Sequence, residues 1–308
     1  MENIVKIQSD VYFAEINLSR GANCISLRNE KYEAKILREP DYSKELDNPY
    51  LYGMPILYPV NRILGGGFEF EGRKYGFPIN EPNTNCHIHG LLHESEFKLL
   101  SRTENSVKCI LESGDIYPEF PHCFRVTMSY ELSKNGLCHK TDIENLSNMN
   151  MPNFLGFHTT FNIPFAKGTM VDDISIHMGV GDEIERNMDV YLPTGVILSA
   201  DDVTNNLNSG FFRPFENVIS RHYKVADDNS IAIEDNDKKI KVVYENDVKY
   251  QFRLIYNGNA DEYICLEPMT CMANCQNSLF DIEYAGFEYI GPGKTKTYIS
   301  KIYIEEIV

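Results

Sequence analysis

Short segments in which apolar and polar residues alternate recur along the whole chain, whereas stretches with helical periodicity are scarce. A period of two is typical of strands with one buried and one solvent-facing side. The clearest examples are residues 107–111, 125–132, 240–244, 250–256 and 298–304. This pattern predicts a protein built mainly from short β-strands.

Turn signals divide these segments. Residues 68–77 alternate on both sides of Gly72, which predicts a hairpin, and Gly291-Pro292-Gly293 predicts a turn before the last strand. The Asp/Asn-rich segments 201–208 and 227–237 are predicted to be surface loops or hairpin tips.

Evenly spaced short strands favour a sandwich or barrel over βαβ units. The 19 tyrosines and 17 phenylalanines suit pleated surfaces. Without an internal repeat or low-complexity linker, the sequence predicts an all-β fold with a few short helices and a single domain over residues 1–308.

The charge balance limits the classes of partner. With 45 acidic and 29 basic side chains the formal net charge is −16, and no Lys/Arg-rich block occurs, which argues against nucleic acid. The first residues do not read as a secretion signal and no apolar run is long enough to span a bilayer, so we expect a cytoplasmic protein without a membrane partner. The eight scattered cysteines are expected to be reduced and mostly buried. The oligomeric state stays open.

The segment His158-Thr159-Thr160-Phe161-Asn162 places an ionisable side chain on a predicted strand. Because strand residues alternate between faces, His158, Thr160 and Asn162 share one side and Thr159 and Phe161 take the other. This polar side indicates either hydrogen-bonding residues or a site.

A second candidate is Glu267, which ends an apolar run and directly precedes Pro268. Because proline cannot continue a central ladder, we expect the chain to leave the sheet there and to place Glu267 at a strand end, where sites are often built. The alternative is a rim carboxylate that accepts a hydrogen bond from a loop amide.

Two further segments suit polar recognition. Arg62 lies between apolar neighbours just before a triple glycine, and its guanidinium suits either a structural ion pair or sugar-type oxygens. His87 and His89 are expected on one side of a strand. His-x-His can supply two metal ligands, but no acidic third ligand stands nearby at a familiar spacing, so we predict no metal site. The triple glycine lacks the spacing of a nucleotide-binding loop.

Together these segments resemble the aldose 1-epimerase family, the galactose mutarotase-like proteins. Each matching piece is weak alone, but the pieces occur in the expected order over nearly the whole chain. They are Gly21-Ala22, Asn61-Arg62-Ile63, the 68–77 hairpin, Ile79-Asn80, His89-Gly90, His158 to Asn162, and Glu267 to Thr270 with Asn274 and Asn277.

The resemblance implies a large antiparallel β-sandwich, the galactose mutarotase-like supersandwich, whose concave face binds a monosaccharide. It also implies roles for four residues. Glu267 matches the family's general base, His158 its general acid, and Arg62 and His89 its sugar-contacting residues.

The implied reaction interconverts the α and β anomers of a free sugar, and it needs neither a metal nor a redox cofactor. A base removes the proton of the anomeric hydroxyl while an acid protonates the ring oxygen, and we expect the two groups on opposite sides of the sugar. A carboxylate with a pKa of about 4.3 and an imidazole with a pKa of about 6.5 suit transfer in both directions.

The chain departs from the family pattern at two places. His89-Gly90 is followed by Leu91, where the family often has another glycine. The segment 219–223 is the best counterpart of the family's sugar-contacting aspartate, but it carries Ser220 or Arg221 at the acidic position. The identity of the sugar therefore stays open.

Three functions are compatible with these residues. The first is an aldose 1-epimerase acting on a free monosaccharide, which we predict. The second is a sugar-phosphate epimerase acting on a hexose 6-phosphate, which requires basic residues for the phosphate, such as Arg62 with Arg213 or Arg221. The third is a non-catalytic carbohydrate-binding module, which has no use for a matched acid and base.

Overall fold

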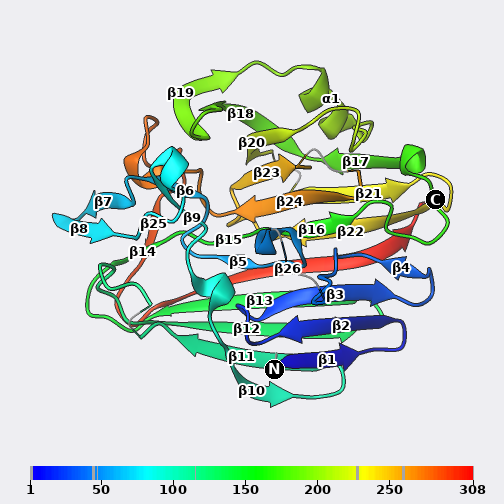
Figure 1. Ribbon diagram of the computed structural model, residues 1–308, viewed down its shortest axis with the longest axis horizontal. Coiled ribbons are helices and arrows are strands. Elements are labelled where there is room, and N and C mark those ends of the chain that lie inside the picture. Colours follow the sequence, from blue (N-terminus) through cyan, green and yellow to red (C-terminus); the bar gives the residue numbers. More distant parts are fainter. Residues whose placement is uncertain are drawn as a thin grey trace.

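Two eight-stranded antiparallel sheets dominate the computed structural model, which describes residues 3–43, 46, 48–114, 116–226, 229–258 and 261–307 (Figure 1). The first, here called the core sheet, contains in spatial order β10 (Lys98–Arg102), β11 (Ser106–Glu112), β12 (Phe124–Ser133), β13 (Gly136–Asn145), β26 (Thr295–Glu306), β22 (Ile240–Asn246), β21 (Ser230–Asp235) and β17 (Ile174–Met178). The second, here called the site sheet, contains β19 (Leu192–Leu198), β18 (Val180–Asn187), β20 (Ser220–Val225), β23 (Phe252–Tyr256), β24 (Tyr263–Met269), β15 (Gly156–Phe157) and β5 (Ile56–Leu57), with β16 (Thr160–Asn162) also paired to β24.

Smaller sheets surround these two. One has four strands, β1 (Ile4–Gln8), β2 (Tyr12–Asn17), β3 (Asn23–Asn29) and β4 (Ala34–Lys35). Three strand pairs complete the described set: β14 (Met151–Asn153) with β25 (Glu288–Ile290), β6 (Arg62–Leu64) with β9 (Cys86–Ile88), and the hairpin β7 (Gly67–Phe70) with β8 (Arg73–Gly76). In Figure 1 that hairpin projects at the left edge and β18 and β19 lie at the top. The architecture confirms the predicted all-β, antiparallel class.

Helical structure is short. The described residues form one α-helix, α1 (Asp202–Ser209), and five 3-10 turns: η1 (Pro49–Leu51), η2 (Pro82–Thr84), η3 (Leu92–Glu94), η4 (Val171–Asp173) and η5 (Cys275–Asn277). Among these residues no helix has the length and apolar character needed to cross a membrane.

The core lies between the two large sheets. Aromatic rings on the inner face of the site sheet meet rings of the core sheet: Phe157 lies 4.9 Å from His139, and Phe161 lies 5.6 Å from Tyr244, measured between ring centroids. All four side chains are buried. Burying such large apolar surfaces is the main driving force for folding, at roughly 25 cal/mol per Å² of apolar area removed from water. The opposite face of the site sheet is thereby left for polar residues.

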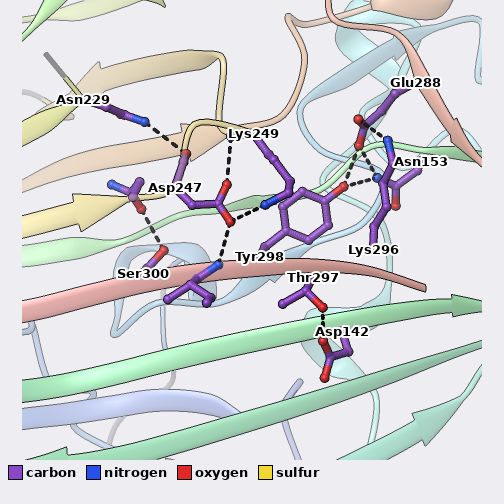
Figure 2. A network of polar contacts seen from close by, with 12 residues as sticks. Asp142, Asn153, Asn229, Asp247, Lys249, Glu288, Lys296, Thr297, Tyr298 and Ser300 are labelled. Carbon is purple, nitrogen blue, oxygen red and sulfur yellow. Dashed lines mark hydrogen bonds and ion pairs between the residues drawn. The ribbon is translucent and has the colours of Figure 1, made fainter. Parts of the chain in front are cut away.

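A polar network around Glu288 fastens the β14–β25 pair to β26 (Figure 2). Its carboxylate accepts hydrogen bonds from Asn153 (2.6 Å) and from the hydroxyl of Tyr298 (2.5 Å), and it also bonds to Lys296. Because these partners lie on β14 and β26, the network joins the rim of the sandwich to its longest strand.

The five predicted strand segments are confirmed: they correspond to β11, β12, β22, β23 and β26. The hairpin at 68–77 is confirmed as β7 and β8, and the turn at 291–293 precedes β26. All eight cysteines are free and six of them are buried, as predicted.

The predicted loop at 201–208 is wrong, because this segment forms α1. The side chain of Asp201 accepts a hydrogen bond from the backbone N–H of Thr204 (3.0 Å), and Gly210 ends the helix with a φ of 77°. The capping bond satisfies a free N–H group at the helix start, and glycine adopts the left-handed conformation without steric cost. These end signals, with Leu207 buried beneath, stabilise a helix of low hydrophobicity.

The predicted loop at 227–237 is also wrong over most of its length. Residues 230–235 form β21, which pairs with β17 on one side and β22 on the other, and Ile231 and Ile233 are buried. The burial of these two alternating isoleucines stabilises a strand here despite the flanking acidic residues. Asp227 and Asp228 lie outside the described residues.

Candidate active site

His158 lies at a break in the site sheet, between β15 and β16. Its neighbours face the core: the hydroxyl of Thr159 bonds to that of Tyr244 (3.0 Å), and Phe161 packs on the same tyrosine. Thr160 instead contacts the thiol of Cys265 (3.3 Å) on the outer face. The predicted alternation is therefore confirmed, and it directs His158 away from the core.

Glu267 lies within β24, so the expectation that it ends a strand is wrong. The strand continues through Pro268 because the missing N–H is not required there. The N–H groups two residues before and two residues after the proline donate to the carbonyls of Thr159 (2.9 Å) and Leu155 (2.8 Å). A donor at 268 would face the stretch between them, where the partner strand is interrupted.

The two side chains meet on the outer face of the site sheet. Nε2 of His158 lies 3.2 Å from Oε1 of Glu267, and the residues are 6% and 2% exposed. The two groups are in direct contact, whereas the sequence led us to expect them on opposite sides of a sugar. The pairing brings together residues 109 positions apart, 158 and 267.

Burial decides the protonation of the pair. It raises the pKa of Glu267 to about 8, although the charges of Arg186 and Arg62 act in the opposite direction. It lowers the pKa of His158 to about 4. Between these limits the pair holds one proton, and burial favours the neutral form of each group.

An aromatic cluster lies beside the pair. The ring of His89 lies 5.6 Å from that of His158, and Tyr50 of η1 lies 4.8 Å from His89 and 6.1 Å from His158. His93 also packs on Tyr50 at 4.6 Å. Tyr50 and His93 join the site from segments that carried no sequence signal of their own.

The two histidines of the His-x-His segment separate. The strand ends at Ile88, and His89 takes a left-handed φ of 62°, so the alternation that would align it with His87 stops. His87 instead bonds through Nδ1 to the carbonyl of Pro78 (2.7 Å) and packs on Phe77. Among the described residues no group of three or more His, Cys, Asp or Glu side chains is placed to hold a metal ion.

Arg62 forms the predicted structural ion pair and also faces the site. Its Nε and Nη2 atoms each lie 2.6 Å from an oxygen of Glu81, so the ion pair is bidentate. Its guanidinium carbon lies 4.6 Å from the ring centre of Tyr191. Arg62 is close enough to Glu267 and His89 for its charge to lower the pKa of both.

Sequence reasoning missed Arg186, on β18. It is 8% exposed, its Nη2 donates to the carbonyl (2.5 Å) and hydroxyl (3.0 Å) oxygens of Ser220, and its guanidinium carbon lies 6.0 Å from the ring centre of Tyr191. The charge of Glu267 acts to raise its pKa, which places it beside the pair. Its neighbours in sequence, residues 182–187, are mostly charged or polar, so no pattern marked it out.

The three other residues considered for substrate recognition lie in different settings. The hydroxyl of Ser220 accepts a hydrogen bond from Arg186. Arg221 forms ion pairs with Glu183 (2.9 Å) and Asp201 (2.7 Å). Arg213 donates to two backbone carbonyls at η4 and the start of β17, those of residues 172 and 174. The predicted phosphate site made by Arg62 with Arg213 or Arg221 is therefore not formed, because Arg213 and Arg221 have other partners.

Comparison with known proteins gives consistent matches. The model of the family described as aldose 1-epimerase matches residues 5–285. An Escherichia coli K12 protein called uncharacterized protein YihR is 23% identical over 251 residues, which cover 79% of this chain and 77% of that protein.

Solved structures match over the whole fold. A galactose mutarotase-like protein from Clostridium acetobutylicum has a TM-score of 0.92 and 28% identity, with 100% of this chain and 98% of that chain covered. Galactose 1-epimerase from Lactobacillus acidophilus NCFM has a TM-score of 0.72 and 15% identity, with 100% and 99% covered, and at that identity it supports the fold alone. The galactose mutarotase-like supersandwich is therefore the fold of this chain.

Proposed function

Because this chain belongs to the aldose 1-epimerase family, we propose that it is an isomerase that interconverts the α and β anomers of a monosaccharide. His158 and Glu267 move the protons in this proposal. The observation that carries it is the 3.2 Å contact between a buried imidazole and a buried carboxyl group, which come from distant parts of the sequence.

Direct contact between the two groups suits the chemistry of anomerisation. The anomeric hydroxyl and the ring oxygen are bonded to the same carbon of the sugar, so the two protons that move lie next to each other. Adjacent donor and acceptor groups in the protein therefore reach both oxygens from one edge of the sugar. Groups on opposite faces of the ring would not have this advantage.

The reaction requires one proton on the pair. In ring opening one group gives a proton to the ring oxygen while the other takes the proton of the anomeric hydroxyl, and ring closure returns both. Each group therefore acts as acid in one half of the reaction and as base in the other. If Glu267 acts as the base, as in the family, His158 must carry the proton. A proton transfer from Glu267 to His158 across their direct contact produces this state.

Arg62 and His89 are proposed to contact the sugar. Arg62 is held by Glu81 and lies against Tyr191, while the ring of His89 packs against those of both Tyr50 and His158. Fixed hydrogen-bond donors hold the anomeric carbon in place and lower the entropic cost of reaction.

A non-catalytic carbohydrate-binding role fits the buried pair less well. Removing an ionisable imidazole and carboxyl group from water costs free energy, and a binding module gains nothing from a matched acid and base in contact. Such groups with shifted pKa values are typical of catalytic sites.

The test is an anomerisation assay. Decay of optical rotation from pure α-D-glucose and from other α-aldoses is followed with and without the protein. We expect acceleration by the wild type and a loss of about 10² to 10⁴-fold in Glu267→Gln and in His158→Asn. Glu112→Gln on the core sheet serves as control, since that carboxylate is exposed and pairs with Arg125. Full activity in both site variants would contradict the proposal.

A further inference from the structure

Arg186 is a buried cation that makes no direct ion pair with a described residue. Two of its hydrogen bonds go to Ser220, but its Nε and Nη1 atoms make no hydrogen bond to the described residues, and it forms no ion pair with a described carboxylate. Burial lowers the pKa of Arg186 to about 10, which still leaves the guanidinium charged at neutral pH. A buried charge without a counter-ion is costly.

The carboxyl groups whose charge acts on Arg186, those of Glu183 and Glu267, have other partners. Glu81 holds Arg62 through two contacts of 2.6 Å, and Glu183 is paired with Arg221 at 2.9 Å. Glu267 is in direct contact with His158 at 3.2 Å. Of the two guanidinium groups beside the catalytic pair, Arg62 has a direct ion pair and Arg186 has none with a described residue.

We propose that the site binds an aldose that carries a negatively charged substituent, and that Arg186 pairs with that group. This inference rests on the proposed anomerase function and names its substrate class. The planar guanidinium presents two free N–H directions, which match the oxygens of a carboxylate or a phosphate. Tyr191, whose ring lies near both Arg186 and Arg62, forms the adjoining wall.

The net charge of the whole chain does not decide this recognition. The formal charge of −16 opposes the approach of an anion, but exposed charges farther away than about 8 Å are largely screened at physiological ionic strength. A buried guanidinium is screened much less. The local charge at the site therefore outweighs the distant acidic residues.

The experiment compares one uncharged and two charged sugars with similar rings. Anomerisation of glucose, glucuronate and glucose 6-phosphate is measured by NMR exchange for the wild type, Arg186→Gln and Arg102→Gln. Arg102 is exposed on the edge strand β10 of the core sheet, so this control removes the same charge away from the site.

We expect the wild type to have a kcat/KM at least about tenfold higher for one of the charged sugars than for glucose. In Arg186→Gln the ratio of kcat/KM for that sugar to kcat/KM for glucose falls at least about tenfold, mainly through the KM of the charged sugar. Arg102→Gln keeps the preference. A wild type that prefers glucose, or an Arg186→Gln variant that loses all three activities equally, would overturn the inference. The wild-type comparison stands even if the variant does not fold.

Failure of the anomerase proposal would look different. If no sugar is anomerised, calorimetric titration of the wild type and Arg186→Gln with glucuronate and glucose 6-phosphate still tests the anion site. Binding by the wild type that is lost in the variant supports a charged ligand at Arg186. No binding to either protein overturns it.

Discussion

Glu267 should destabilise the folded protein at neutral and alkaline pH, and Glu267→Gln should remove that cost. In the unfolded chain the carboxyl group has its ordinary pKa of 4.5, whereas burial raises its folded pKa to about 8. Between these values the folded protein keeps a proton that the unfolded chain releases. The free energy of unfolding of the wild type therefore falls as the pH rises, while glutamine has no proton to lose.

The size of the effect follows from one linked proton. Each pH unit between about 5 and 8 should add about 1.4 kcal/mol to the advantage of the variant. The shift of Glu267 is about 3.5 units, so the advantage should reach roughly 3 to 5 kcal/mol above pH 8. Below pH 4.5 both side chains are neutral and the advantage disappears. His158 is present in both proteins, so its own titration largely cancels in the difference.

Urea unfolding followed by far-UV circular dichroism at pH 4.5, 6, 7 and 8 measures the difference, because the chain has no tryptophan to report by fluorescence. Glu112→Gln, which removes an exposed carboxylate, should show little change in stability with pH. A difference between Glu267→Gln and the wild type that stays constant from pH 5 to 8 would refute a raised pKa for Glu267. The site would then hold an ionised carboxylate, and the proton of the pair would not lie on Glu267.

Three further predictions follow from the same site. The rate of anomerisation, corrected for the spontaneous reaction, should be constant between about pH 4 and 8 and fall outside this range. Below pH 4 the pair gains a second proton, and above pH 8 it loses its last one. A rate that only rises with pH, with a midpoint near pH 6.5, would contradict this. Gly90→Ala should lower the free energy of unfolding, measured by urea titration, by roughly 2 kcal/mol or more. The reason is that φ of residue 90 is +67° and a Cβ there would lie 1.9 Å from the carbonyl oxygen of Tyr58. A decrease of less than about 0.5 kcal/mol would contradict this prediction. Arg62→Lys should raise KM about tenfold with a smaller effect on kcat, because lysine cannot form the bidentate ion pair with Glu81. An unchanged KM would argue against a contact between Arg62 and the sugar.

The strand content of the fold could be predicted because alternation is a local property. The segment from His158 to Phe161 also showed correctly which side chains face the core. The helix α1 could not be found by periodicity, since its stability comes from the Asp201 cap and from Gly210 at its ends. Strand β21 was hidden by acidic residues on both sides, although Ile231 and Ile233 carried its signal.

The site could be predicted in part. His158 and Glu267 were found by residue type and family resemblance, but their contact depends on how β24 pairs with the interrupted strands β15 and β16. The proline after Glu267 suggested a strand end because the gap in the neighbouring strand is not visible in sequence. Arg186 and Tyr50 were missed for the same reason, since tertiary packing alone brings them to the pair.

If His158 and Glu267 act as one proton-transferring unit, a double-mutant cycle on the anomerisation rate will show it. Rates are measured for the wild type, His158→Asn, Glu267→Gln and the double variant. We expect each single variant to lose about 10² to 10⁴-fold in rate and the double variant to be no slower than the slower single one. A double variant whose loss equals the product of the two single losses would contradict it, as would single variants that keep the wild-type rate.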